Sequence, residues 1–294
     1  MNKIMAQVKM DLNSMFELTN MGKPSKIVSI EITQEEGFLT IKQTGYIESI
    51  LKQEGMEHTN SVKTSLNLKQ TIEPNPEGNK GNKSNPYARL IGSLQYLATA
   101  TCPDIVFAVN RLSAFTANPS MSHQTAAKCI LRYLSGTKNL SITYRKTTAH
   151  ENNNLFHGYH KSLYSDSSPV HGYADAAFVN NDKCHSTSGY ICLYGSRRGH
   201  NMGVKKQTTI ALLLTEAEYM ALSEAARKAK WLRNLYVELG FQTDSPIPLF
   251  GDNRGALKMA INPQFHRCLK HIKIWWHWIR EQVEEKDIAN MQKN

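Results

Sequence analysis

The chain has 294 residues, of which 40% are hydrophobic and 20% charged, and its formal net charge is +10. This composition excludes a disordered polyelectrolyte, and the length suggests about two domains that can each bury a core. We see no apolar run of the about 18 residues that cross a bilayer and no signal-peptide core, so we expect no membrane partner and a cytoplasmic or nuclear protein. Five cysteines without a Cys-x-x-Cys pair favour a reducing compartment and argue against a zinc site.

The first half of the chain has mostly helical spacing of its apolar residues, interrupted by two short runs of β-branched residues. The predicted elements are a helix over 4–17, strands over 27–32 and 38–41, a helix over 43–51, and three helices between 86 and 134. Gly136 is expected to end the last of these helices. Polar stretches at 71–86 and 147–154 are typical of surface linkers.

In the second half, short strands alternate with helices, which predicts an α/β unit. The predicted strands cover 172–178, 189–194, 210–214 and 248–250. The predicted helices cover 216–239, 254–261 and 274–285.

The positive charge is concentrated between Lys83 and Lys146, a segment that contains eight basic residues and one acidic residue, Asp104. Such a segment attracts phosphate backbones because binding releases the counterions of the nucleic acid. A solubilising surface explains the same charge, so this pattern alone only favours a nucleic-acid partner.

Three acidic residues of the second half are candidate metal ligands. Asp175 lies in a strand-like run, Glu218 in the first turn of the longest helix, and Asp252 between a strand and a helix. Carboxylates from adjacent strand ends and a facing helix can converge on Mg²⁺, and two such ions can promote phosphodiester hydrolysis. Each residue also has a structural interpretation: Glu218 as part of a capping box with Thr215, Asp252 as a helix N-cap, and Asp175 as an exposed strand residue.

Six motifs, in this order, resemble the ribonuclease H domain of copia-type LTR-retrotransposon Pol polyproteins. They are Gly172-Tyr173-Ala174-Asp175-Ala176, Ser186-Thr187-Ser188-Gly189-Tyr190, Lys205-Lys206-Gln207-Thr208-Thr209, Thr215-Glu216-Ala217-Glu218-Tyr219-Met220-Ala221, Gly251-Asp252-Asn253-Arg254-Gly255-Ala256 and 271–281, which begins His271-Ile272-Lys273. Upstream, Gln43-x-x-Tyr46-Ile47, Pro103-Asp104-Ile105 and the run 126–137 are similar to the end of the reverse-transcriptase palm and its thumb-like helices.

The resemblance implies an α/β protein whose C-terminal part is a ribonuclease H-like mixed β-sheet with flanking helices. A mainly α thumb-like region with a short palm β-hairpin would precede this sheet. The expected divisions are a palm remnant over 1–58, a thumb or connection region over 59–146, a linker over 147–157 and the ribonuclease H-like domain over 158–294.

By the same resemblance, Asp175, Glu218 and Asp252 are expected to be the catalytic carboxylates and to hold Mg²⁺ or Mn²⁺. The expected partners are an RNA–DNA hybrid or another nucleic acid, together with the rest of Pol, including the upstream palm and integrase, if the chain is part of a polyprotein. The residues expected to contact nucleic acid are Lys128, Arg132, Lys205, Lys206, Gln207 and Arg254. For 205–207, a solvated turn is an open alternative.

The sequence departs from the family pattern in two places that bear on activity. Lys273 occupies the position of the expected fourth carboxylate, so we expect hydrolysis of RNA in hybrids to be impaired. The chain contains no Tyr-x-Asp-Asp motif, so we expect a truncated Pol fragment without polymerase activity. The alternative to a weak ribonuclease H is an inactive retroelement remnant that only binds nucleic acid.

Overall fold

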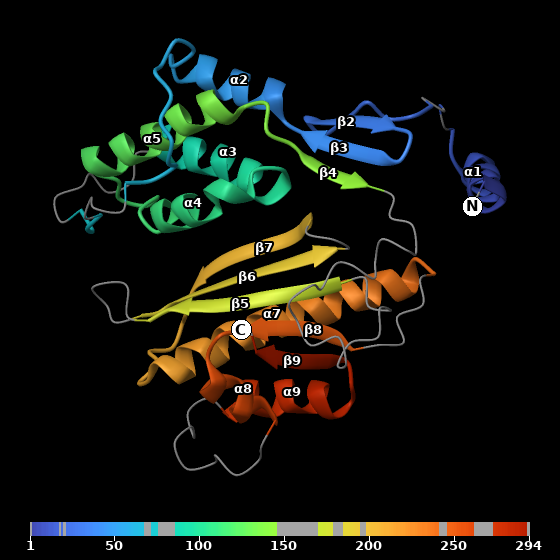
Figure 1. Cartoon of the computed structure of the whole chain (residues 1–294). Helices are drawn as coiled ribbons and strands as arrows, with labels where there is room; N and C mark the ends of the chain where they lie inside the picture. Colours follow the sequence, from blue (N-terminus) through green and yellow to red (C-terminus); the bar gives the residue numbers. More distant parts are fainter. Residues whose placement is uncertain are drawn as a thin grey trace.

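The computed structural model describes residues 2–17, 19, 22–67, 72–75, 86–145, 170–178, 185–194, 198–240, 246–261 and 273–292. Within these ranges, a helical half with a small sheet precedes a second half built on a five-stranded sheet (Figure 1). Residues 71 and 76–85 of the linker predicted over 71–86 lie outside the described residues, as do the linker predicted over 147–157 and the expected boundary at 158.

The first half contains five α-helices, one 3-10 helix and four strands among the described residues. Its elements are α1 (Asn2–Met15), β1 (Lys26–Ile27), β2 (Ile30–Glu35), β3 (Phe38–Lys42), α2 (Thr44–Gln53), α3 (Pro86–Ala100), η1 (Pro103–Ile105), α4 (Val106–Ser113), α5 (Met121–Thr137) and β4 (Ile142–Arg145). The four strands pair antiparallel in the order β1-β2-β3-β4. The predicted helices and the strand predicted over 38–41 are therefore present. The strand predicted over 27–32 is wrong in part, because Val28 and Ser29 form a turn between β1 and β2, and β4 is an additional strand.

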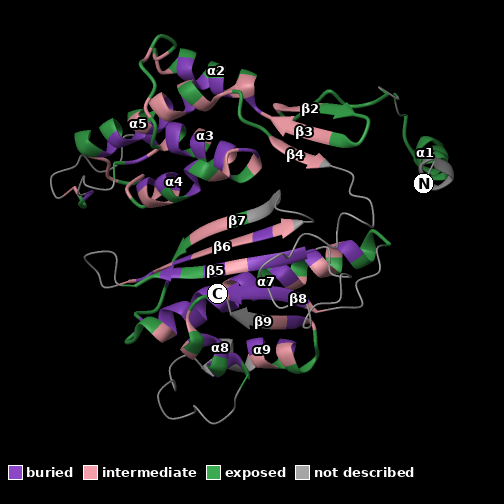
Figure 2. Cartoon of the chain, viewed as in Figure 1, coloured by how far each residue is buried: buried purple, intermediate pink, exposed green. Residues whose placement is uncertain are grey.

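The core of this half combines α2 with α3, α4 and α5. Fully buried leucines and isoleucines such as Ile47, Leu94, Leu112 and Leu134 form this cluster, which appears purple in Figure 2. α2 precedes residue 58, so this core includes side chains from both sides of the expected palm–thumb boundary. The domain boundaries themselves remain a prediction.

The second half is an α/β unit with a mixed sheet. Its elements are β5 (Val170–Ala177), β6 (Thr187–Tyr194), β7 (Arg198–Lys206), α7 (Leu214–Glu238), β8 (Ile247–Gly251), α8 (Arg254–Ile261), α9 (Lys273–Glu284) and β9 (Ile288–Gln292). The strand order is β7-β6-β5-β8-β9, antiparallel on the β7 side and parallel from β5 to β9. The expected mixed sheet with flanking helices is confirmed.

The long helix α7 packs on the centre of this sheet. Small side chains on its inner side, including Ala221, Ala225 and Ala229, are fully buried, so the helix lies close to β5 and β6. α7 continues for 25 residues and is followed by Gly240, whose φ of +83° is the left-handed conformation that glycine adopts easily. Glu218 belongs to this helix and Asp175 to β5, so this packing brings together two of the candidate ligands.

Two further predictions about local structure were wrong. The run 210–214 forms no strand; residues 210–213 precede the helix, and Leu214 is already the first residue of α7. Gly136 does not end α5, which continues to Thr137. A Cβ at Gly136 would lie 2.8 Å from the Cβ of Ser61, so this glycine permits close packing of the segment before α3.

Candidate metal centre

Asp175 lies within β5, and Asp252 directly follows the adjacent parallel strand β8. Tyr173 of β5 pairs with Phe250 of β8, and each aspartate follows two residues after its member of that pair. The rings of Tyr173 and Phe250 stack with centroids 5.0 Å apart, which reinforces the register. This register places Asp175 and Asp252 next to each other on the neighbouring chain segments.

Glu218 approaches these carboxylates from α7. One carboxylate oxygen from each of Asp175, Glu218 and Asp252 can be chosen so that all three atoms lie within 4.8 Å of one another. Asp175 and Asp252 are exposed, whereas Glu218 is only 8% exposed. The structure thus brings together all three predicted carboxylates as a set of oxygen donors, the donor type that Mg²⁺ and Mn²⁺ prefer.

The electrostatics of the cluster are unfavourable without a cation. Burial and the nearby charges of Asp175 and Asp252 raise the pKa of Glu218 to about 7, although the backbone N–H of Ala176 opposes this rise. A divalent cation among the three carboxylates would reverse this effect because it favours their charged forms.

The helix-capping interpretation of Glu218 is wrong, because a neighbouring glutamate interacts with the chain before α7. The N-cap residue is Leu213, without a side-chain capping bond, and Oε2 of Glu216 accepts a hydrogen bond from the backbone N–H of Leu212 at 2.6 Å. Glu216 is 2% exposed and faces the interior. The Glu218 carboxylate is therefore directed to the cluster.

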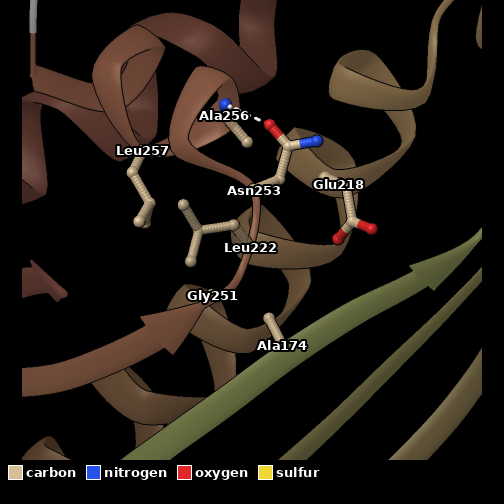
Figure 3. A pocket seen from close by; sticks show the side chains of 7 residues that line it. All are labelled: Ala174, Glu218, Leu222, Gly251, Asn253, Ala256 and Leu257. Atoms are coloured by element: carbon tan, nitrogen blue, oxygen red, sulfur yellow. Dashed lines mark hydrogen bonds between the residues drawn. The ribbon is translucent and has the colours of Figure 1, made fainter. Parts of the chain in front are cut away.

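The helix-capping interpretation of Asp252 is also wrong. At the start of α8, Oδ1 of Asn253 accepts the backbone N–H of Ala256 at 3.0 Å (Figure 3). Asn253, Glu218, Ala174 and Leu257 are among the residues that line a pocket of about 10 Å³ beside the cluster, roughly the room that one water needs. Asp252 thus stays exposed at the strand end.

Five of the residues expected to contact nucleic acid differ in exposure: four are exposed and one is half-buried. Lys205 and Lys206 on β7, Arg254 at the start of α8 and Lys128 on α5 are exposed, as a phosphate-binding side chain must be. Arg132 is half-buried and donates from Nε to the carbonyl of Asn60 at 2.8 Å, and Lys205 lies 3.1 Å from Glu224.

Gln207 differs from the other expected contacts because it is 5% exposed and its amide donates inside the protein. No motif in the sequence indicated this internal role.

Lys273 is the first residue of α9, and its side chain lies outside the described residues. Its position at the start of α9 does not by itself place it against the cluster. The prediction about Lys273 therefore remains a prediction.

No helix among the described residues is long and apolar enough to span a membrane.

Comparison with known proteins places this chain in a family. It is 31% identical to the retrovirus-related Pol polyprotein from transposon TNT 1-94 of Nicotiana tabacum, over 97% of this chain and 20% of that protein. It is 32% identical to the retrovirus-related Pol polyprotein from transposon RE1 of Arabidopsis thaliana, over 93% of this chain and 17% of that protein. The chain belongs to the copia-type retrovirus-related Pol polyproteins, and it spans about a fifth of the length of these relatives.

Two further comparisons add little. No family model matches the chain. The foamy viral protease-reverse transcriptase, solved in complex with double-stranded DNA, aligns with 90% of this chain and 38% of that chain at 12% identity and a TM-score of 0.45. That likeness is too low to support a conclusion about this chain.

Proposed function

We propose that this Pol-derived chain is a ribonuclease H-type nuclease that hydrolyses the RNA strand of RNA–DNA hybrids with Mg²⁺ or Mn²⁺. The single observation that carries the proposal is the convergence of Asp175, Glu218 and Asp252 within 4.8 Å. Asp175 belongs to β5, Asp252 directly follows the adjacent strand β8, and Glu218 belongs to the packed helix α7, and together these elements are a rigid support for a catalytic site.

The three carboxylates suit divalent cations in both chemistry and charge. When bound, such ions activate water and stabilise the leaving oxygen of a phosphodiester. Asp175 and Asp252 are exposed and can share their oxygens with a substrate-bound ion, whereas the buried Glu218 would hold the ion from the α7 side.

Exposed cations near the cluster support a nucleic-acid substrate. Arg254 follows Asp252 by two residues, and Lys205 and Lys206 lie on the edge strand β7. Lys and Arg bind phosphates without regard to sequence. A hybrid fits this chemistry because proteins recognise such A-form duplexes by shape and by 2′-hydroxyls.

Lys273 is proposed to weaken this activity. Replacement of an expected carboxylate by an ammonium group changes the local charge by two units. At about 5 Å and an effective dielectric constant of about 20, each unit charge against a divalent ion is worth several kcal/mol. We expect hydrolysis to be slower by about two orders of magnitude, the scale of one lost electrostatic stabiliser.

Lys273 also supports the second candidate function, an inactive remnant that only binds nucleic acid. In that case the basic segment between Lys83 and Lys146 would be the main contact with the phosphate backbone. The chain contains no Tyr-x-Asp-Asp sequence, and we propose that this chain alone does not polymerise DNA. Association with the rest of Pol is likewise a proposal.

Single-turnover cleavage of an RNA–DNA hybrid in Mg²⁺ tests these alternatives. The native chain, Lys273→Asp and Asp175→Asn are compared at equal concentration, and hybrid binding is measured for each. Weak cleavage by the native chain, faster cleavage by Lys273→Asp and none by Asp175→Asn would support the nuclease. No cleavage by any of the three, with binding retained, would favour the inactive remnant.

A further inference from the structure

Gln207 is a buried polar residue that the proposed chemistry does not use. It directly follows β7 and precedes the segment that leads to α7. Its main chain is fixed on both sides, because its N–H donates to the carbonyl of Ser186 at 2.9 Å and its carbonyl accepts from Nδ1 of His185 at 2.8 Å. The side chain therefore starts from a well-defined position beneath the surface.

The side-chain amide of Gln207 joins the sheet to the helix. Nε2 donates to Oγ of Ser188 on β6 at 2.9 Å and to the carbonyl of Ala217 on α7 at 2.8 Å. Both bonds are buried, and buried hydrogen bonds fix geometry more firmly than exposed ones. One nitrogen atom thus connects two elements that are far apart in the chain.

Both ends of this connection lie next to a candidate ligand. Ser188 pairs with Ala176 of β5, which directly follows Asp175. Ala217 directly precedes Glu218 in α7. The contact that Gln207 makes between β6 and α7 therefore lies beside the residues that carry these two carboxylates.

The second polar atom of the amide shows that this arrangement has a cost. Oε1 of Gln207 is buried, and no donor from the described part of the chain reaches it. Leaving a buried acceptor unpaired is unfavourable, so the two donor bonds of the Gln207 amide are made at a cost in stability.

The carboxylate cluster needs such a support. Three carboxylates within 4.8 Å repel one another when charged, and this repulsion would act to separate the start of α7 from the sheet. A rigid tie between α7 and β6 opposes that movement and keeps the donor atoms at the spacing that an ion requires.

We infer that Gln207 is a positioning residue that holds Glu218 against Asp175 and so preorganises the metal centre. The role of Gln207 in metal binding rests on the proposed function. The hydrogen bonds from Gln207 to Ser188 and Ala217 are present in the protein without metal. It assigns Gln207 a role different from direct contact with nucleic acid.

The test compares Gln207→Met with a matched control, Gln282→Met. Gln282 is 2% exposed, lies in α9 and accepts a hydrogen bond from Lys230 of α7, twelve residues beyond Glu218 and about 18 Å further along the helix. Both variants replace a buried, hydrogen-bonded glutamine by an apolar side chain of similar size. A third variant, Ser188→Ala, removes only the β6 end of the tie.

Two quantities are measured in the full chain of each variant. Isothermal titration with Mn²⁺ gives the metal affinity, and hydrogen exchange followed by NMR gives the protection of the amides of residues 217–219. Denaturant unfolding confirms that each variant is folded. We expect Gln207→Met to bind Mn²⁺ about 10- to 100-fold more weakly, the usual effect of losing a residue that orients a ligand. Amide exchange at 217–219 should be faster in Gln207→Met and Ser188→Ala than in Gln282→Met.

The outcomes separate this inference from the proposed function. If Gln207→Met and Gln282→Met have the same exchange rates at 217–219, the inference is overturned, whatever the metal affinity. If the native chain binds no Mn²⁺, the proposed metal centre fails, and the exchange comparison alone decides whether Gln207 holds α7. Faster exchange without any change in Mn²⁺ affinity would overturn the claim that the tie serves the metal centre.

Discussion

Asn253 caps α8 through Ala256, whose backbone N–H it accepts at 3.0 Å, and this bond leaves the adjacent Asp252 out of the helix cap. The same division of labour occurs at α7, where Glu216 interacts with the chain before the helix and Glu218 joins the cluster. In both places, one polar residue stabilises a helix start and its neighbour supplies a carboxylate to the site. Substitutions within each pair should therefore have different consequences.

Glu216 is predicted to contribute to stability and Glu218 to cost stability. Glu216→Ala removes the acceptor of the part-buried hydrogen bond from the backbone N–H of Leu212 and should lower the free energy of unfolding by about 1 kcal/mol. Glu218→Gln should raise that free energy at pH 8 in EDTA because it removes one of three repelling charges. Urea unfolding of both variants measures the two effects, and a loss of stability in Glu218→Gln would contradict the account.

The pH dependence of stability gives a second test of Glu218. Its folded pKa of about 7 lies above the unfolded value of 4.5, so the native state binds more protons between these pH values. The contribution of Glu218 is fully present below about pH 4.5 and is lost as the pH rises through 7, with a total of about 3 kcal/mol. The free energy of unfolding is measured in EDTA at pH 5 and pH 8 for the native chain and for Glu218→Gln. It should fall less between these pH values in Glu218→Gln, and an equal fall in both proteins would refute the assignment of this pKa to Glu218.

His123 should make the helical half sensitive to acid. Its Nδ1 accepts the backbone N–H of Ser120 at 2.8 Å, its ring stacks on Phe115, and burial lowers its pKa from 6.5. The native state therefore binds fewer protons than the unfolded state, and stability present above pH 6.5 is lost as the pH falls through the folded pKa.

Glutamine at position 123 can keep the cap without titrating. His123→Gln is expected to unfold with a weaker dependence on pH between 7 and 5 than the native chain, as measured by circular dichroism in denaturant. An unchanged dependence would show that His123 is not the titrating group.

The turn between β1 and β2 should be open to stabilisation. Val28 and Ser29 have φ values of +46° and +65°, which suit asparagine and glycine in a two-residue hairpin. The double substitution Val28→Asn with Ser29→Gly should raise the free energy of unfolding by about 1 kcal/mol or more, since it relieves backbone strain. The Tyr96 hydroxyl bonds only the carbonyl of Val28, so that contact is retained. No gain in stability would count against strain at this turn.

The sequence predicted the helices well because their apolar period is strong, and α8 was predicted with its observed bounds. Strand β7 was missed because its segment contains Gly199, Gly203 and charged residues in place of alternating apolar ones. Gly203 is needed there, since a Cβ would lie 2.5 Å from the ring of Tyr190. The strand predicted over 210–214 was wrong because only Ala211 of 210–213 is buried.

The residues of the candidate site were easier to predict from the sequence than the edge strand β7. Asp175 lies in a strand-like run, Asp252 follows one, and Glu218 lies in a strongly periodic helix, a pattern that allows convergence. The spacing left a structural interpretation open for each residue, and the family resemblance favoured the metal site. The tie through Gln207 could not be predicted, because hydrogen bonds to Ser188 and Ala217 depend on packing between distant segments. The sequence likewise could not decide which residue of each pair makes a hydrogen bond near the helix start and which joins the cluster.

The most direct measurement of the central claim is Mn²⁺ binding by isothermal titration to the native chain, Asp175→Asn and the remote control Glu238→Gln at pH 8. The account predicts that the native chain and Glu238→Gln bind Mn²⁺ alike and that Asp175→Asn binds at least tenfold more weakly, because it loses one of three converging carboxylates. Equal Mn²⁺ affinity in Asp175→Asn and the native chain would contradict it.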